Sequence, residues 1–229
     1  MNTRTNVLLL IGSPKAKSTS ASLGNYLLGL LRQSCLSTGT LHIGSTLRSP
    51  DGIRTMHEAV DGADIIVLAF PLYVDSLPGP LVSALESLAR HRRGRDCPSR
   101  QRLLAIANCG FPESCHNDTA LAQVRLFCRD AGFEWVGGLG LGGGGMINGL
   151  PLEKRGLAVH DVIASLRLAA HALAAGSALP DEAISLMARK RIPSWLYTFI
   201  GNTGWKREAK KFGALEKLHD RPYQDGARP

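Results

Sequence analysis

Short apolar runs alternate along the chain with segments in which apolar residues recur at helical spacing. Three runs are continuously apolar, as in parallel strands covered on both faces, and they span residues 7–11, 65–70 and 103–107. A fourth candidate, residues 133–141, contains glycines that weaken the strand pattern, and residues 41–43 form a short edge-strand candidate. The alternation predicts a doubly wound parallel sheet with helices on both faces.

The helical segments are marked by apolar residues three or four positions apart. These stripes fall within residues 23–31, 81–88, 121–127 and 159–173. A stripe of this kind more often packs into a core than contacts a cofactor, and we assign all four to packing.

The pattern changes after residue 175. We expect residues 1–176 to form the α/β domain and residues 177–229 to form a helical C-terminal extension. Within the extension, the Gly-Asn-Thr-Gly sequence at 201–204 is expected to separate an aromatic run at 195–200 from a basic helix at about 205–218.

Composition fits an ordinary globular protein, with 44% hydrophobic and 20% charged residues. No apolar run approaches the roughly 18 residues of a membrane span, and we expect a cytoplasmic protein. The five cysteines include no CxxC pair. This spacing favours neither a disulfide framework nor a zinc or iron–sulfur site, so we expect no metal.

The formal net charge of +8 is concentrated in residues 185–229, which hold ten Lys/Arg against four Asp/Glu. Positive charge attracts phosphates, anionic lipids and nucleic acids alike. The arginines at 90–102 lack interleaved aromatic residues, and we therefore expect no nucleic-acid partner. The aromatic and basic extension is either a membrane-surface anchor or a cap on the domain or a second subunit, and the intervening Gly-Asn-Thr-Gly favours the cap.

The first strand is followed by residues 12–22, Gly-Ser-Pro-Lys-Ala-Lys-Ser-Thr-Ser-Ala-Ser. Hydroxyls and lysines gather there at the expected start of a helix, where free backbone N–H groups and the helix dipole favour an anion. An ordinary helix cap is the alternative. The loop is not a Walker A motif, and the GxGxxG match at Gly140, Gly142 and Gly145 is accidental because Asn-Gly-Leu-Pro follows where a helix would begin.

Two more strand ends carry unusual loops. Residues 70–80 contain three prolines beyond the strand and a tyrosine, which together offer a stiff apolar surface for an aromatic ring or a rigid turn. Residues 108–113, Asn-Cys-Gly-Phe-Pro-Glu, contain Gly110, which permits close backbone approach to a ligand. No evident base accompanies Cys109, and a packing role explains it better than a nucleophilic one.

The three loops in this order resemble those of the flavodoxin-like NAD(P)H-dependent FMN reductase family: GSPKxKSxS, PLYVDSLPxxLxxxLE and NCGFPE. The resemblance covers roughly residues 5–175, and the tail also resembles extensions of some members. It implies a five-stranded sheet of order 2-1-3-4-5, in which these loops are neighbours, and a homodimer. The implied FMN-binding residues are Ser13, Lys15, Ser18, Thr19 and Ser20 for the phosphate, Pro71, Leu72, Tyr73 and Val74 beside the ring, and Asn108, Cys109 and Gly110 at its pyrimidine edge.

The family also implies an FMN-dependent oxidoreductase that passes hydride from NAD(P)H to a small-molecule acceptor such as a quinone, an azo or nitro compound, or free flavin. The flavin carries this chemistry, and no catalytic side chain is expected. The alternatives are an electron carrier or an FMN-binding module without a nicotinamide site. Carriers of this fold are usually acidic, and the charge of +8 argues against one.

Overall fold

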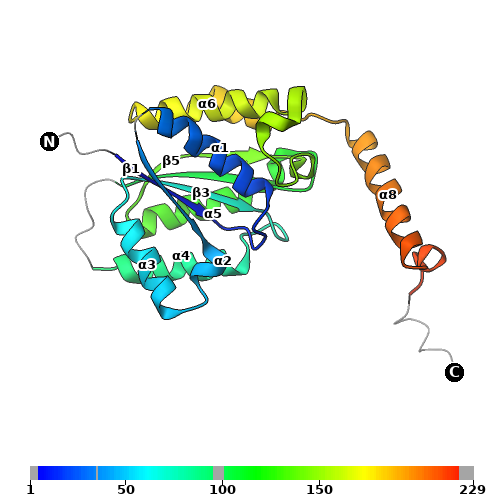
Figure 1. The fold of residues 1–229 in the computed structure, drawn as a ribbon, viewed down its shortest axis with the longest axis horizontal. Helices are drawn as coiled ribbons and strands as arrows, with labels where there is room; N and C mark the ends of the chain where they lie inside the picture. Colours follow the sequence, from blue (N-terminus) through cyan, green and yellow to red (C-terminus); the bar gives the residue numbers. More distant parts are fainter. Residues whose placement is uncertain (1–4, 35, 95–100, 222–229) are drawn as a thin grey trace. The chain divides into compact units, whose positions relative to one another are not determined.

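The structure, a computed structural model, describes residues 5–34, 36–94 and 101–221 (Figure 1). Its strands are β1 (Asn6–Ile11), β2 (Ser37–His42), β3 (Ile65–Pro71), β4 (Arg102–Asn108) and β5 (Glu134–Leu141). They form one sheet of order β2-β1-β3-β4-β5 in which every neighbouring pair is parallel. The predicted sheet order is therefore confirmed.

Helices cover both faces of the sheet. One face is covered by α1 (Thr19–Gln33), α6 (His160–Ala174) and α7 (Asp181–Ala188), and the other by α3 (Pro50–Asp61), α4 (Gly79–Arg92) and α5 (Asp118–Ala131). The remaining helical segments are α2 (Ile43–Thr46), η1 (Ser114–Asn117), η2 (Gly144–Met146), η3 (Leu152–Val159), α8 (Ser194–Lys211) and η4 (Leu215–Lys217).

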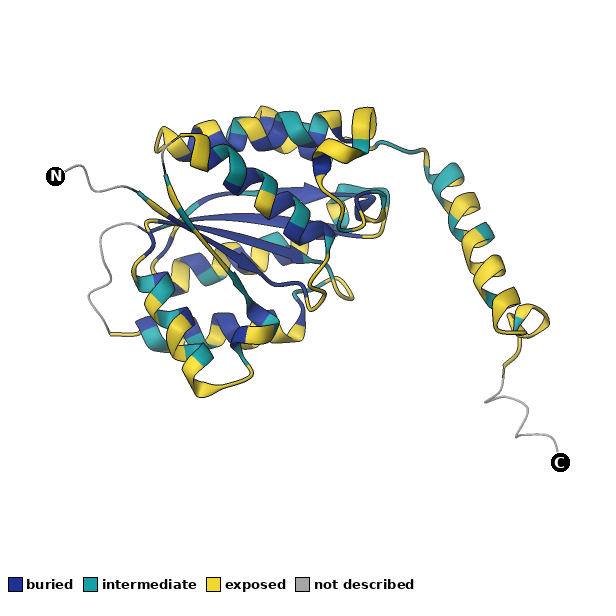
Figure 2. Cartoon of the chain, in the orientation of Figure 1, coloured by how far each residue is buried: buried dark blue, intermediate teal, exposed yellow. Residues whose placement is uncertain are grey.

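Apart from the edge strand β2, the strands are largely buried between two hydrophobic cores (Figure 2). In β1, Val7, Leu9 and Ile11 point into the core on the α1 and α6 face, whereas Leu8 and Leu10 point into the core on the α3, α4 and α5 face. Successive side chains of a strand alternate between faces, so a strand covered on both faces is apolar at every position. This is why the apolar runs predicted β1, β3 and β4.

The edge strand differs from its prediction. The structure places β2 at Ser37–His42, whereas Ile43 begins α2 and is buried in the core. An edge strand is less covered than a central one, and β2 accordingly has the polar sequence Ser-Thr-Gly-Thr-Leu-His with no fully buried residue. The apolar pattern at residues 41–43 therefore predicted only the C-terminal end of β2.

The compact unit containing the sheet extends to Arg191, later than the boundary at residue 176 that we expected. Helix α7 belongs to this unit because Ala183 and Met187 are buried in its core and Ser165 Oγ donates to Ala183 O at 2.6 Å. Just before α7, Leu179 packs where a side chain at Gly137 would stand, since a Cβ there would lie 2.7 Å from Leu179 Cβ.

The second unit, residues 192–229, contains α8. The predicted break at Gly-Asn-Thr-Gly is wrong, because α8 runs continuously from Ser194 to Lys211 through Gly201 and Gly204. Glycine lowers helix propensity by about 1 kcal/mol per residue without forbidding helical angles. The aromatic run and the first half of the basic segment thus share one helix.

One segment, Leu152–Ala174, is long and apolar enough by composition to cross a membrane. In the fold it comprises η3 and α6, and Val162, Leu166, Ala169 and Leu173 are buried against the sheet. It is a partly buried core helix.

The basic patch at residues 90–102 is interrupted by a buried arginine. Arg92 Nε donates to Ala131 O at 2.7 Å, its Nη1 donates to Gln101 Oε1, and its guanidinium carbon lies 3.9 Å from the centre of the Phe133 ring. Gln101 Nε2 in turn donates to Ala63 O at 2.6 Å. Arg92 therefore anchors the end of α4, while Arg95 and Arg100 lie outside the described residues.

Candidate functional site

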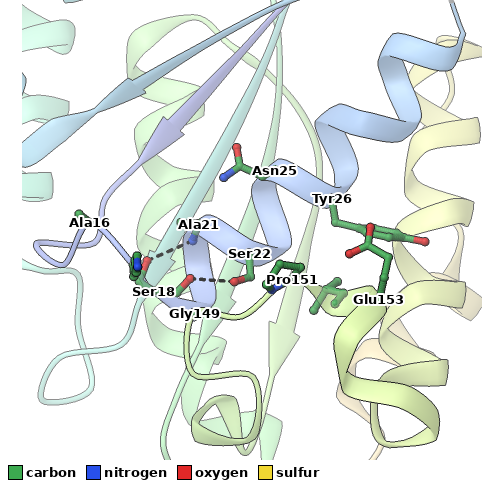
Figure 3. A pocket seen from close by; sticks show the side chains of 11 residues that line it. Ala16, Ser18, Ala21, Ser22, Asn25, Tyr26, Gly149, Pro151 and Glu153 are labelled. Carbon is green, nitrogen blue, oxygen red and sulfur yellow. Dashed lines mark hydrogen bonds between the residues drawn. The ribbon is translucent and has the colours of Figure 1, made fainter.

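The loop between β1 and α1 begins at a closely packed glycine. Gly12 N donates to Ala69 O at 2.8 Å, and a Cβ on Gly12 would lie 2.8 Å from Leu81 Cδ2. Ser18 then caps α1, because its Oγ accepts from Ala21 N at 3.1 Å (Figure 3). The Ser18 hydroxyl proton and the first backbone N–H groups of the helix are left to donate to an anion.

Thr19 and Ser20 point their hydroxyls into the protein rather than into a ligand site. Thr19 Oγ1 donates to Gly144 O at 2.7 Å, and Ser20 Oγ donates to Asn108 Oδ1 at 2.9 Å. Both residues are buried. These two hydroxyls tie the start of α1 to the loops after β4 and β5, and the backbone N–H groups of the helix start are left for an anion. The contact of both residues with a phosphate stays a prediction.

The loop after β3 ends in a tight turn. Tyr73 N donates to Ser76 O at 2.9 Å and Ser76 N donates to Tyr73 O at 3.2 Å, while Val74 and Asp75 adopt positive φ angles of 49° and 56°. A β-branched residue in this left-handed region is strained, and such strain persists only where the surroundings impose it. Val74 is 98% exposed at the tip, and Leu72 packs against the core beneath α4 and α5.

The predicted ring-flanking residues are thus divided. Pro71 and half-exposed Tyr73 line the hollow described below, whereas Leu72 and Val74 do not. Leu72 points into the core between Pro71 and Tyr73, as alternation along an extended segment requires, whereas Val74 lies at the exposed tip of the turn.

Backbone hydrogen bonds hold the loop after β4 against the end of β5 and the loop that follows it. Cys109 N donates to Leu141 O at 3.0 Å, and Cys109 O accepts from Gly144 N at 2.8 Å. The Cys109 backbone N–H and carbonyl therefore already have partners in β5 and the following loop, and its bond to a pyrimidine edge stays a prediction. Gly110 is exposed, and a Cβ there would meet nothing within 4 Å, so a ligand can approach its backbone.

The Cys109 thiol is buried among carbonyl groups. Its Sγ lies 3.5 Å from both Phe111 O and Glu113 O, and Asn117 Nδ2 donates to it at 3.4 Å. Burial is the largest influence on this thiol and raises its pKa above the ordinary value, with the hydrogen bond to the Phe111 backbone opposing the shift. The neutral thiol therefore dominates at neutral pH, as expected for a packing role.

We expect iodoacetamide to alkylate Cys109 far more slowly than the exposed Cys115 at neutral pH, because only the thiolate reacts. The raised pKa also requires the Cys109 rate to keep rising at pH values above the ordinary pKa of a thiol. Peptide mass spectrometry on one sample measures both sites, and urea-unfolded protein is the control in which the two rates should converge. Equal rates in the folded protein would show that Cys109 is accessible and activated.

The glycine-rich loop after β5 forms another wall of the site, which the sequence indicated only as a glycine run. Gly143 N donates to Phe111 O at 2.6 Å, and a Cβ on Gly142 would lie 2.3 Å from Pro112 O. A Cβ on Gly149 would lie 3.0 Å from Ser18 N. The loop thus packs against both the β4 loop and the start of α1, and η2 rather than a long helix follows the accidental GxGxxG match.

These loops surround a hollow of about 160 Å³ at the carboxyl edge of the sheet, where ligands of open α/β sheets bind. It is lined by Ser13, Lys15, Ser18, Thr19, Ser20, Pro71, Tyr73, Asn108, Cys109, Gly110, Gly144, Gly145 and Asn148. Ten of the twelve predicted site residues are therefore brought together here, and Leu72 and Val74 are not. Gly144, Gly145 and Asn148 are additional.

The charge of this hollow suits an anion. Lys15 is the only lysine or arginine among the described residues that line it, and none of them is an aspartate or glutamate. Figure 3 shows an adjoining hollow of about 310 Å³ that shares Ser18 and runs between α1 and residues 149–153. The hydroxyls, helix start and exposed glycine backbone fit a phosphate-bearing ring compound such as FMN, which would extend beyond the small hollow itself. In the described part of the chain, no group of three His, Cys, Asp or Glu side chains is placed to hold a metal ion.

A family model described as NADPH-dependent FMN reductase matches residues 5–114, which include the loops after β1, β3 and β4. No protein of curated function matches the sequence. Similar solved structures include an NAD(P)H:quinone oxidoreductase from Methanothermobacter marburgensis, with a TM-score of 0.56 and 15% identity over 74% of this chain and 96% of that chain.

Two further structures have the same fold. The NADH:FMN oxidoreductase EMOB has a TM-score of 0.57 and 20% identity, covering 84% of this chain and 98% of that chain. An FMN-dependent NADH-azoreductase from Bacillus anthracis str. Ames Ancestor has a TM-score of 0.52 and 13% identity, covering 74% of this chain and 99% of that chain. Residues 5–114 thus match the NADPH-dependent FMN reductase family model, and the sheet has the flavodoxin-like strand order.

Proposed function

We propose that this protein is an FMN-dependent oxidoreductase that takes hydride from NAD(P)H and delivers electrons to a small-molecule acceptor. The observation that carries the proposal is that the start of α1, capped by the Ser18 hydroxyl, meets the β3 and β4 loops in one hollow, and that no aspartate or glutamate is among the described residues lining it. An anion and a planar ring need these two surfaces side by side. The family match over the same loops supports the cofactor.

In this proposal the phosphate of FMN binds at the start of α1. Ser18 Oγ donates its free proton, the backbone N–H groups of Thr19 and Ser20 donate from the helix start, and Lys15 adds positive charge. Ser13, which is buried and accepts from Lys15 N at 3.2 Å, keeps its own hydroxyl proton for the same anion. Ser20 acts indirectly, because it holds the Asn108 carboxamide.

The ring is held between the β3 and β4 loops. Pro71 and Tyr73 supply an apolar surface, and Asn108 supplies a carboxamide whose oxygen is already engaged by Ser20, leaving its N–H groups to donate. Bound FMN would supply the hydride and electron transfer itself, and the chain orients the ring and restricts water. The exposed Tyr73 turn leaves room for acceptors such as quinones, azo or nitro compounds, or free flavin.

The test is to incubate the purified protein with FMN, desalt it, record the visible spectrum and add NADPH and NADH separately without oxygen. We expect a retained flavin spectrum that bleaches promptly with at least one nicotinamide. A retained flavin that neither nicotinamide reduces would indicate an electron carrier, and absence of flavin would overturn the proposal.

A further inference from the structure

A second hollow, of about 370 Å³, adjoins the proposed flavin site and shares Ser13 with it. Its walls come from the loop after β1, from α2 and from the start of α4, three segments that meet at the end of β2 (Figure 1). The residues that matter for its chemistry are Ser13, His42, Ser45 and Arg48. Neither the sequence motifs nor the family match assigns this hollow a role.

The hollow is cationic. No aspartate or glutamate is among the described residues that line it, and Arg48 is exposed at its rim. In the described chain no carboxylate pairs with the Arg48 guanidinium, whereas Arg54 pairs with Asp51 at 3.0 Å and Arg189 with Asp161 at 3.2 Å. An arginine that lies beside a hollow and has no carboxylate partner attracts a phosphate. Its planar guanidinium can donate two hydrogen bonds to the phosphate oxygens.

The other polar groups favour an anion as well. His42 can donate from its imidazole. Ser45 Oγ donates to His42 O at 2.9 Å. This hydrogen bond stabilises the turn from β2 into α2, the segment that precedes Arg48. The hollow therefore offers donors from the end of β2 and from the residues that follow α2 to a single group.

We infer that this hollow binds the 2′-phosphate of NADPH, and that Arg48 is the residue by which the protein distinguishes NADPH from NADH. This inference rests on the proposed function. The proposed site of the FMN phosphate is the start of α1, so the second hollow is available to a second phosphate-bearing ligand that must reach the same flavin.

The experiment compares FMN-loaded wild-type protein with Arg48→Gln, and uses Arg54→Gln as the matched loss of one arginine outside the hollow. Isothermal titration calorimetry with 2′,5′-ADP and with 5′-ADP measures phosphate recognition without any turnover. We expect Arg48→Gln to weaken 2′,5′-ADP binding about 10- to 100-fold, as for loss of a charge-assisted hydrogen bond, with 5′-ADP binding unchanged. The Arg54→Gln variant should match wild type.

Anaerobic reduction by the two nicotinamides gives the second measurement. We expect Arg48→Gln to raise the half-saturating NADPH concentration by the same factor and to leave the NADH rate and the retained FMN unchanged. Equal effects on both ADP probes, no effect on either, or failure of the wild type to bind 2′,5′-ADP would each overturn the inference. Loss of FMN from Arg48→Gln would also overturn it, because the hollow would then hold the flavin phosphate.

These outcomes are distinct from failure of the proposed function. If wild-type protein retains no FMN, the proposed function fails, whereas selective loss of 2′,5′-ADP binding in Arg48→Gln would still support the phosphate site.

Discussion

Replacing Ser18 with aspartate is expected to abolish FMN retention while leaving the protein as stable as wild type. Aspartate is as good a helix N-cap as serine, so it can still accept from Ala21 N, and its negative charge suits the start of α1. The same charge would repel a phosphate carrying about −1.5 to −2 charges. At about 4 Å and an effective dielectric constant of about 20, one such pair of unit charges costs about 4 kcal/mol.

We therefore expect FMN affinity to fall at least about 100-fold, equivalent to about 2.8 kcal/mol. Flavin absorbance after desalting and a fluorescence titration measure the affinity, and thermal unfolding followed by circular dichroism measures stability. The control is Ser49→Asp, because Ser49 caps α3 in the same way by accepting from Gly52 N at 3.1 Å and does not line the flavin hollow. Retention of FMN by Ser18→Asp would place the phosphate elsewhere.

Replacing Gly142 with alanine is expected to destabilise the protein and to weaken FMN binding, whereas the same change at Gly145, which also lines the flavin hollow, is expected to leave stability unchanged. A Cβ at position 142 would lie 2.3 Å from Pro112 O and 2.8 Å from Pro112 C, so the backbone itself must move. At Gly145 a Cβ would meet nothing within 4 Å. Overpacking of this kind costs about 1–3 kcal/mol, and an open surface site changes stability by less than about 0.5 kcal/mol.

The effect on the flavin follows from what Gly142 supports. The next two residues bind the β4 loop through Gly143 N to Phe111 O and Gly144 N to Cys109 O, and Gly144 O accepts from Thr19 at the start of α1. A displaced backbone at Gly142 would shift all three contacts and one wall of the hollow. Urea unfolding and FMN titration of both variants test this; similar behaviour of the two would show that the close packing at Gly142 does not hold in solution.

The central strands and their packing helices were predictable because both depend on local patterns. A strand covered on both faces must be apolar throughout, and a helix that packs on a sheet must carry an apolar stripe. Helix α3 was missed because its buried positions are few, with Met56 and Val60 alone fully buried. The continuity of α8 was missed because glycine propensity is a weak determinant of helix ends.

The loops of the candidate site were recognisable from their residue types, but the roles of individual side chains were not. Ser18, Thr19 and Ser20 are adjacent hydroxyl residues, yet only Ser18 keeps its hydroxyl at the helix start. Thr19 donates to Gly144, 125 residues away in sequence, and Ser20 donates to Asn108, 88 residues away. No local pattern specifies partners at such separations.

The sequence by itself determined the order of apolar and polar segments, and with it which loops stand at strand ends. That information is local, since alternation of faces and helix starts depend on residues a few positions apart. Only the tertiary structure decided that Leu72 packs inward, that Cys109 is enclosed by carbonyl groups, and that Arg48 borders a hollow without carboxylates. These features depend on which distant segments the parallel sheet brings to one edge, and crossover connections make that a property of the whole chain.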